Sequence, residues 1–332
     1  MDKLNVGVIG VGWFGNFHSL IYKSLPGVNL IGVCDLDYDR AKEVANKVGT
    51  KAFKDINDLL SVNEINAVSI CTKEQFHIKP FLAACSAKKN ILIEKPLALT
   101  VEEIDQMISA AKDAGIKATV GHELRFNQRL LTAKEKIQNG EIGSLKYFFA
   151  RRNMRITAPM HVGNSCGYHS LVYHGAVHDI ELMDWLSESE IVEANGIYQA
   201  GVVESIGIPV SDTVLALLKF GNGVAAITEH CWIYPESHPS RVEALLEING
   251  TKGKIVINFD MGGAICYSND RVENFEYPHW PISEDILASD LKEEIESFVS
   301  CIINNRSFPV TLDDARKAVK GAQLIDQSIS QF

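Results

Sequence analysis

Three glycines close to the start of the chain restrict its fold more than any other feature. Gly10, Gly12 and Gly15 follow an apolar run over residues 4–9 and open a helical pattern. In this G-x-G-x-x-G spacing the first glycine allows a tight turn, the second lets the backbone approach a pyrophosphate, and the third lets the helix pack closely on the strand. The N-terminus of the helix then faces the anion. The pattern predicts a dinucleotide-binding α/β unit built on a parallel sheet.

A carboxylate stands where such a unit needs one to recognise a ribose. Asp35 follows the second apolar run, twenty residues after Gly15. A carboxylate there accepts hydrogen bonds from the adenine ribose hydroxyls and repels a 2′-phosphate, so NAD is expected in preference to NADP. Trp13 and Phe14, between the second and third glycines, are expected to border the cofactor as well. Arg40 could pair with a phosphate, but a solvated helix face is the simpler place for it.

The first 122 residues alternate short apolar runs with helical stretches. This alternation requires crossover connections and predicts a doubly wound parallel sheet with helices on both faces, a Rossmann domain over residues 1–122. The clearest helix covers residues 101–114, because Thr100 and Glu103 form a capping box and Gly115 follows the last turn. Strands are expected over residues 4–9, 28–34, 67–71, 91–94 and 117–121.

From residue 145 onward the runs are longer and are joined by tight turns. These hairpin signals predict an α+β second domain over residues 123–310 with a mainly antiparallel sheet. A C-terminal helix within residues 311–332 could pack back on the first domain. The hairpins pair residues 210–220 with 224–233 and 241–248 with 254–258, and the helices cover about 286–304 and 312–329.

Composition narrows the class of protein. A chain of 332 residues is long enough for two domains, and its net charge of -10 argues against nucleic acid or an anionic membrane as a partner. Seven scattered cysteines, an odd number, predict free thiols in a reducing compartment. There is no basic N-terminal region, and no apolar run of about 18 residues. A cytoplasmic protein is expected.

Lys95 is the first catalytic candidate. It follows the apolar strand at residues 91–94 and precedes Pro96, which cannot donate to a sheet ladder and so ends the strand. Ligands of open parallel sheets bind outside the carboxyl ends of the strands. A lone lysine at a strand end is usually solvated. Behind a dinucleotide-binding turn, however, this position is where cofactor and substrate would meet.

A polar stripe marks one helix of the second domain. His174, His178, Glu181 and Trp185 have the spacing i, i+4, i+7 and i+11, so a helix over about residues 170–186 presents them on one face. Histidine suits proton transfer because its pKa lies near neutrality. The competing interpretation is a metal site, since three further candidate ligands precede the stripe. They lack a recognised ligand spacing, so no metal is expected; they are His161, Cys166 and His169.

Taken together, these motifs resemble the glucose-fructose oxidoreductase, inositol dehydrogenase and MocA (Gfo/Idh/MocA) family of NAD(P)-dependent oxidoreductases. The resemblance covers nearly the whole chain, and its specific part is the Glu-Lys-Pro element. The matching positions are Gly10, Gly12, Gly15, Asp35, Thr72, His77, Glu94, Lys95, Pro96, Arg125, Phe126, Asn127 and His178.

The resemblance implies reversible hydride transfer between NAD and a secondary alcohol of a sugar, sugar derivative or cyclitol. It implies that Lys95 bonds the reacting hydroxyl and that His178 exchanges its proton. A homodimer or homotetramer formed through the C-terminal sheet is also implied. Residues bordering the cofactor would be Thr72, His77 and Glu94, and those reaching the substrate Arg125, Arg152, His174 and His178.

One departure from the family pattern affects the proton acceptor. Many members have aspartate four residues before the catalytic histidine, where this chain has His174. Aspartate stabilises an imidazolium as it forms, and a second histidine cannot offer that charge. Whether His174 or His178 accepts the proton therefore stays open. A smaller departure is Lys73, where the family usually has proline.

Two other functions remain compatible with the sequence. In the first, bound NAD oxidises a sugar transiently, enabling elimination or hydrolysis, and is then regenerated. In the second, the fold is an NAD-sensing regulator. A pure sensor needs neither Lys95 nor His178, so retention of both favours an enzyme.

Overall fold

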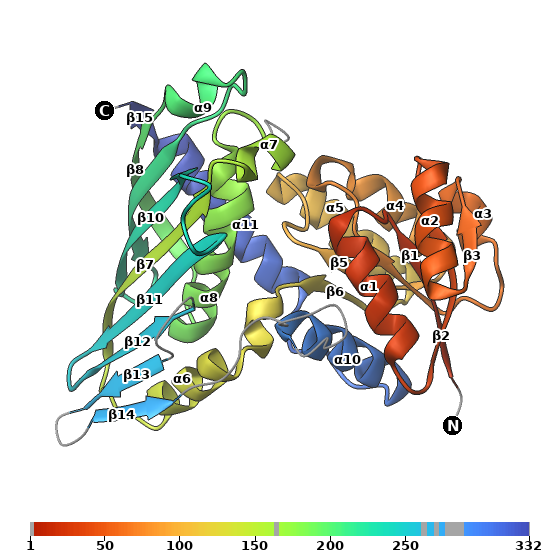
Figure 1. Ribbon diagram of the computed structural model, residues 1–332. Helices are drawn as coiled ribbons and strands as arrows, with labels where there is room; N and C mark the ends of the chain where they lie inside the picture. The colour runs from red at the N-terminus through yellow and green to blue at the C-terminus, as the bar shows by residue number, and fades with distance from the viewer. Residues whose placement is uncertain (1–2, 163–165, 260–263, 269–271, 276–288, 332) are drawn as a thin grey trace. The chain divides into compact units, whose positions relative to one another are not determined.

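The computed structural model describes residues 3–162, 166–259, 264–268, 272–275 and 289–331 (Figure 1). The chain forms two compact units. The first comprises Met1–Glu123 and Trp280–Arg316, and the second Leu124–His279 and Lys317–Phe332. Among the described residues, no helix is both long and apolar enough to cross a membrane.

The first unit contains a six-stranded sheet in the order β3-β2-β1-β4-β5-β6, and every neighbouring pair is parallel. The predicted doubly wound fold is therefore confirmed. The order reverses between β1 and β4, which places the turns after these two strands next to each other. The strands are β1 Leu4–Ile9, β2 Val28–Cys34, β3 Lys51–Phe53, β4 Ala67–Ile70, β5 Asn90–Glu94 and β6 Ala118–Gly121.

Helices flank this sheet, and their ends follow local sequence rules. The expected capping box is present, because Thr100 Oγ1 accepts a hydrogen bond from the Glu103 backbone N–H. The same helix ends at Gly115, whose φ of 66° suits glycine. The helices are α1 Trp13–Ser24, α2 Tyr38–Val48, α3 Ile56–Leu60, the 3-10 helix η1 Glu74–Phe76, α4 Ile78–Ser86 and α5 Val101–Ala114.

The helix α10, Asp290–Ile303, also belongs to the first unit. The sequence pattern had grouped this segment with the second domain. The difference has a packing cause: Leu291, Ile295 and Phe298 are buried in the same core cluster as residues of β1 and α1. An amphipathic helix lies where its apolar stripe is covered, whatever its place in the chain.

The second unit contains a nine-stranded sheet in the order β14-β13-β12-β11-β7-β10-β9-β8-β15. The expected antiparallel character is confirmed, although β7 with β10 and β8 with β15 are parallel pairs. Both predicted hairpins are present, as β9–β10 and β11–β12. The strands are β7 Leu145–Arg155, β8 Ile191–Gln199, β9 Thr213–Phe220, β10 Ala225–Tyr234, β11 Val242–Gly250, β12 Lys254–Asn258, β13 Ala264–Tyr267, β14 Val272–Phe275 and β15 Ser330–Gln331.

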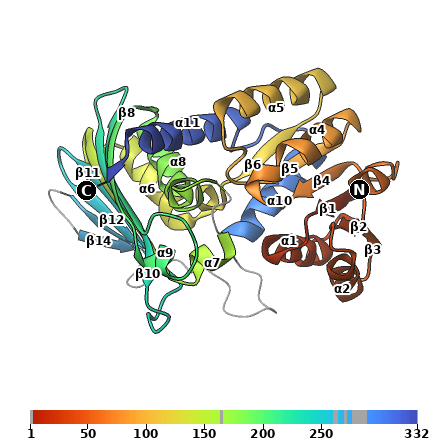
Figure 2. The ribbon, with the colours of Figure 1, turned by 90° about the horizontal axis from the view of Figure 1, so that it is seen from above.

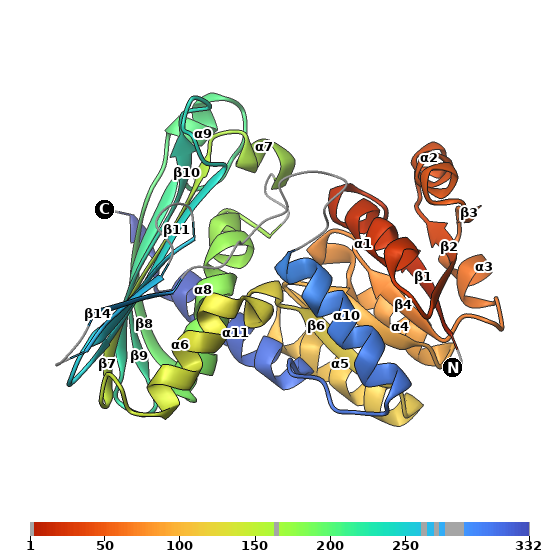
Figure 3. The same ribbon diagram turned by 60° about the horizontal axis from the view of Figure 1, so that its bottom comes forward.

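Helices of the second unit lie on one side of its sheet, as Figures 1 to 3 show for α6, α8 and α11. A Cβ on Gly321 of α11 would lie 2.9 Å from the Ile180 side chain of α8, so only glycine allows this approach. The first turn of α11 belongs to the other unit, where Arg316 pairs with Asp105. The helices are η2 Glu123–Phe126, α6 Gln128–Gln138, α7 Ala158–Val162, the π-helical η3 Val172–Ala176, α8 Val177–Ser187, α9 Val202–Ser205 and α11 Leu312–Ser328.

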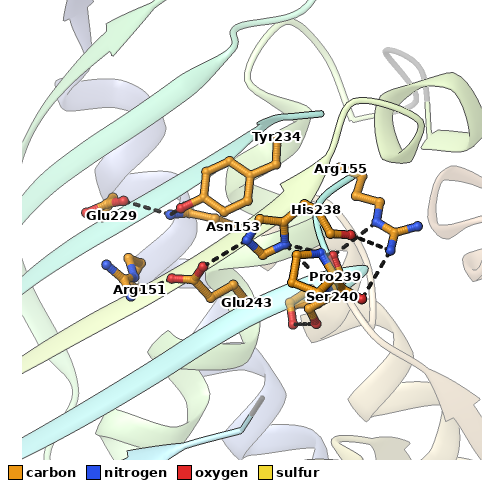
Figure 4. Close-up of polar contacts among 10 residues, drawn as sticks. Arg151, Asn153, Arg155, Glu229, Tyr234, His238, Pro239, Ser240 and Glu243 are labelled. Atoms are coloured by element: carbon orange, nitrogen blue, oxygen red, sulfur yellow. Dashed lines mark hydrogen bonds and ion pairs between the residues drawn. The ribbon is translucent and has the colours of Figure 1, made fainter. Parts of the chain in front are cut away.

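The opposite face of this sheet carries exposed apolar side chains beside a polar network. Leu217 and Ile227 are paired across β9 and β10, and Leu217 is 60% exposed. Nearby, Figure 4 shows the Glu243 carboxylate between Arg151 and His238, with His238 Nε2 3.3 Å away. This face of the sheet therefore presents both apolar and charged side chains to its surroundings.

Candidate active site

The three glycines of the turn differ in the space around them: two are in close contact with the backbone and one is not. A Cβ on Gly15 would lie 1.9 Å from the Gly10 carbonyl oxygen, and one on Gly10 would lie 2.8 Å from the Thr72 backbone nitrogen. A Cβ on Gly12, in contrast, would meet no atom within 4 Å. Gly12 is the N-cap of α1, so no side chain caps the first backbone N–H groups of the helix. The first turn also contains no acidic residue. The helix end can therefore bind an anion that approaches Gly12.

Asp35 joins the end of β2 to this turn. Its Oδ2 accepts a hydrogen bond of 2.9 Å from the Val11 backbone N–H, and its Oδ1 accepts one of 2.9 Å from Asp37. Arg40 lies beside it, with Nη2 2.9 Å from Asp37 and Nη1 3.7 Å from Asp35. The hydrogen bond from Arg40 lowers the pKa of Asp37. Two carboxylates thus offset the one cation here, which disfavours a 2′-phosphate.

His77 links two turns at the carboxyl edge of the sheet. Its Nε2 lies 2.9 Å from the Thr72 carbonyl oxygen, and its Nδ1 lies 2.9 Å from the Pro96 carbonyl oxygen. Burial lowers the pKa of His77, which favours the neutral ring, and only one nitrogen then donates. The ring fixes the spacing between the turn carrying Thr72 and the turn carrying Lys95.

Two further observations fit a bound dinucleotide. Thr72 Oγ1 is buried and has no hydrogen-bond partner within the described parts of the chain, as expected of a group whose partner is a ligand. Trp13, in the first turn of α1, is 56% exposed, and its ring packs edge-on against Phe14 and Phe17 at 4.9 and 5.0 Å between centroids. Large apolar rings at a helix N-terminus are suited to contact a cofactor.

Glu94 is held by a buried chain of polar groups. Its Oε1 lies 3.0 Å from His18 Nε2, and His18 Nδ1 lies 3.2 Å from Ser69 Oγ. The Ser69 hydroxyl is also 2.7 Å from the Tyr22 hydroxyl. This chain orients the Glu94 carboxylate toward α1, so the residue that follows, Lys95, starts from a fixed backbone position.

More carboxyl groups gather around Gly121, the last residue of β6. A Cβ at this glycine would lie 3.1 Å from Glu94 Oε1 and 3.4 Å from Glu294 Oε1. Burial, followed by the charges of Glu94, Glu123 and Asp290, raises the pKa of Glu294 well above its ordinary value. Burial also raises the pKa of Glu123 to about 7, against the opposing charge of Lys95. Sequence reasoning missed Glu123 and Glu294.

Glu294→Gln is expected to stabilise the protein at pH 7 and to change its stability little at pH 4. The raised pKa means that folding keeps Glu294 protonated while the unfolded chain ionises above about pH 4.3. Glu294 therefore destabilises the fold increasingly as pH rises, and glutamine removes that penalty. Thermal unfolding at both values tests this, with exposed Glu102→Gln as the control. An equal effect at both pH values would contradict it.

In the second unit, the two histidines lie on the accessible side of a continuous helix over residues 170–187. The helix is π-helical over Val172–Ala176 and α-helical from Val177 onward. From Leu171 to Ile180, only His174 and His178 are not fully buried. The predicted helix is confirmed, and these histidines are its accessible groups in that stretch.

Asp179, next to His178, is the centre of a buried ion network that sequence reasoning missed. Asp179 is 1% exposed, and Arg152 donates to both of its carboxylate oxygens. The distance is 3.0 Å from Nε to Oδ2 and 2.8 Å from Nη2 to Oδ1. His230 Nε2 lies 3.1 Å from Asp179 Oδ2. Burial opposes ionisation, but the charge of Arg152 and hydrogen bonds from His230 and Arg152 outweigh it and lower the pKa of Asp179.

The two arginines proposed for substrate binding both have carboxylate partners in their own unit. Arg152 is held by Asp179, and Arg125 Nε donates to Glu181 Oε1. The Arg125 guanidinium carbon also lies 4.8 Å from the centroid of the Trp185 ring. A substrate role for either arginine remains a prediction.

The alternation of buried and exposed positions along β7 and β10 could have revealed this network. Arg152 on β7 and His230 on β10 occupy the buried face of the sheet. Charged groups at inward positions require partners. As for metal, no group of three or more candidate ligands comes together among the residues the structure describes.

Comparison with known proteins agrees with this architecture. The family profile described as "Oxidoreductase family, NAD-binding Rossmann fold" matches residues 4–122, and "GFO/IDH/MocA C-terminal domain" matches residues 130–256. The chain belongs to the Gfo/Idh/MocA family. It is therefore an NAD-dependent oxidoreductase, and the expected NAD-binding Rossmann domain is confirmed.

Several known proteins resemble this chain over nearly its whole length. Myo-inositol 2-dehydrogenase of Thermotoga maritima is 28% identical over 318 residues, covering 95% of this chain and 93% of that protein. UDP-N-acetylglucosamine 3-dehydrogenase of Acidithiobacillus ferrooxidans superposes with a TM-score of 0.84 at 24% identity, covering 99% and 98%. Scyllo-inositol dehydrogenase of Lactobacillus casei, solved with NAD(H) and scyllo-inositol, gives 0.83 at 20% identity, covering 99% and 97%. Both structures share the fold.

Gly12→Ala and Gly15→Ala should separate cofactor binding from folding. A methyl group at Gly12 has room in the protein alone but occupies the approach to the helix N-terminus. NAD should then bind about tenfold more weakly or worse, a loss of roughly 1.4 kcal/mol, at an unchanged Tm. Gly15→Ala should lower Tm, because its methyl group collides with the Gly10 carbonyl. Calorimetry and thermal unfolding test the pair; wild-type NAD affinity in Gly12→Ala would contradict the assigned site.

Proposed function

We propose that the protein reversibly oxidises a secondary alcohol of a sugar, sugar derivative or cyclitol. The observation that carries this is Lys95, which follows β5 at the sheet edge where the glycine turn and Thr72 are found. The inositol dehydrogenase relative supports the substrate class. NAD(P)-dependent dehydrogenation of a CH–OH group is the reaction that these features favour.

The residues divide the chemistry between a hydride and a proton. NAD, when bound, supplies the acceptor for the hydride that leaves the carbinol carbon. Lys95 donates a hydrogen bond to the alcohol oxygen and stabilises the charge that develops there. His178 takes the hydroxyl proton, and His174 contacts the substrate beside it. Asp179, held by Arg152 and His230, fixes the helix turn that carries His178.

A panel of sugars and cyclitols, assayed with NAD and with NADP, tests the proposal. Reduced nicotinamide that accumulates in step with the ketone product would support net oxidation. Product without such accumulation would indicate a transient redox cycle. Absence of turnover across the panel, despite tight NAD binding, would indicate a regulator.

The proposal extends to the oligomeric state of the protein and to its cellular compartment. We expect a homodimer or homotetramer formed through the sheet face that exposes Leu217 and Ile227, because apolar surface of this kind marks an interface. Light scattering in solution tests this expectation. All seven cysteines are free thiols, which supports a reducing, cytoplasmic setting.

A further inference from the structure

Glu123 and Lys95 occupy neighbouring strand ends in the first unit. β5 and β6 are parallel, and Glu94 is paired with Gly121 in their register. The two strands therefore leave the sheet at the same edge. Lys95 is one residue beyond its end of the pair, and Glu123 is two residues beyond the other. Backbone topology thus places Lys95 and Glu123 just beyond the ends of neighbouring strands.

Among the carboxyl groups of this cluster, Glu123 is the one whose pKa is lowered by the charge of Lys95. Glu94 is already engaged through Oε1 with His18 on α1. Glu294, on α10, is 2% exposed and neither of its oxygens has a hydrogen-bond partner within the described residues. The charges acting on Glu294 are those of Glu94, Glu123 and Asp290, whereas Lys95 acts on Glu123 directly.

Among the described residues of its unit, the charged groups that act on Glu123 are of both signs. They are Lys95 and Glu94 at the end of β5, and Asp290 and Glu294 on α10, with His122 preceding Glu123 in the chain. Carboxyl groups crowded in this way cannot all ionise at neutral pH. The lysine compensates one negative charge, and the position of Glu123 makes it the natural partner.

We propose that Glu123 is a positioning residue for Lys95: as a carboxylate it holds the ammonium group where the alcohol oxygen binds, and on protonation it releases it. The inference rests on the proposed function, since it assigns the group that sets the geometry of Lys95. Because the pKa of Glu123 is about 7, the hold on Lys95 weakens as pH falls through neutrality. Activity should fall over the same range.

The first test is a titration of the protein without substrate or cofactor. Glutamate labelled with 13C at the side-chain carboxyl should show one resonance with a midpoint near pH 7. Glu123→Gln should abolish this titration. Lys95→Met should move its midpoint to higher pH, because loss of the nearby positive charge favours the protonated acid. Persistence of the titration in Glu123→Gln, or an unmoved midpoint in Lys95→Met, would overturn the pairing.

The second test is the pH dependence of kcat/KM for a substrate found in the panel. The wild type should lose activity below about pH 7, whereas Glu123→Gln should have a plateau roughly tenfold lower and should lose the part of this limb that Glu123 causes, leaving the part that protonation of the base His178 causes. Glu123→Asp should recover part of the plateau, and Glu102→Gln should behave as wild type. An unchanged limb in Glu123→Gln would refute the positioning role.

These two tests fail independently. If no substrate is turned over, the proposed function fails, but the titration still decides whether Glu123 is coupled to Lys95. If the titration shows no coupling while oxidation proceeds, the proposed function stands and the role of Glu123 is refuted. NAD affinity, measured in each variant, should be unchanged by Glu123→Gln.

Discussion

Lys95→Met is expected to lower kcat/KM by about a hundredfold to a thousandfold, with NAD affinity unchanged within roughly a factor of two. Methionine keeps much of the length of the side chain but removes the donor and the positive charge. Both act on the alcohol oxygen as negative charge develops there, so the loss should fall mainly on kcat. The glycine turn and Asp35, which are expected to bind the cofactor, are held by other contacts: Asp35 accepts a hydrogen bond from Val11, and the glycine turn packs on itself and on Thr72.

Steady-state kinetics and NAD calorimetry on the same preparations measure this effect. Lys79→Met is a suitable control, since Lys79 is an exposed lysine on α4 in the same unit. Wild-type turnover in Lys95→Met, with intact NAD binding, would exclude the proposed role. A fall in NAD affinity equal to the fall in kcat/KM would instead make Lys95 a cofactor ligand.

The Rossmann fold and its glycine turn could be predicted because their sequence requirements are local. The glycine spacing, the strand before it and the carboxylate after the next strand lie within a short stretch, and in the structure Asp35 accepts a hydrogen bond from Val11 of the glycine turn. The turn signals at the β9–β10 and β11–β12 hairpins are local too, and both hairpins were predicted. β3, Lys51–Phe53, was missed, because three partly exposed residues carry almost no periodic signal.

The groups that hold the candidate catalytic residues could not be predicted in the same way. Asp179 meets Arg152 and His230 from two strands far away in sequence, and Glu294 reaches Gly121 from a helix near the end of the chain. Long-range contacts of this kind leave no spacing to read. The sequence signal for this network is a charged residue among apolar ones. Asp179 lies among the mostly apolar buried residues of α8, and a buried charge requires a partner.

The π-helical segment is a further feature that could not be predicted from sequence spacing. Val172–Ala176 adds a residue to a turn ahead of His178, which ideal α-helical spacing does not anticipate. Within this segment, a Cβ on Gly175 would lie 3.3 Å from Met154 and 3.8 Å from the His230 ring, which shows how closely the helix approaches the sheet. This proximity lets Asp179 reach both Arg152 and His230.

Asp179→Asn is expected to lower the free energy of unfolding by about 3 to 5 kcal/mol, because it leaves the buried Arg152 charge without its carboxylate. The lowered pKa of Asp179 fixes the sign of the pH dependence: its contribution is present above the unfolded value of about 3.9 and is lost as pH falls through the folded value. The wild type and Asp179→Asn should therefore converge in acid. Urea unfolding at several pH values measures the difference.

A double-mutant cycle separates this charge effect from simple loss of packing. Arg152→Met alone should also be costly, since among the described residues it leaves the ionised, buried Asp179 with His230 as its remaining side-chain partner. Arg152→Met combined with Asp179→Asn removes both charges together and should cost less than the sum of the two single changes. Additive losses, or single losses below about 1 kcal/mol, would mean that the network behaves like an exposed ion pair. Strong coupling would instead show that the turn carrying His178 is held by charge, which is the condition its proposed role in proton transfer requires.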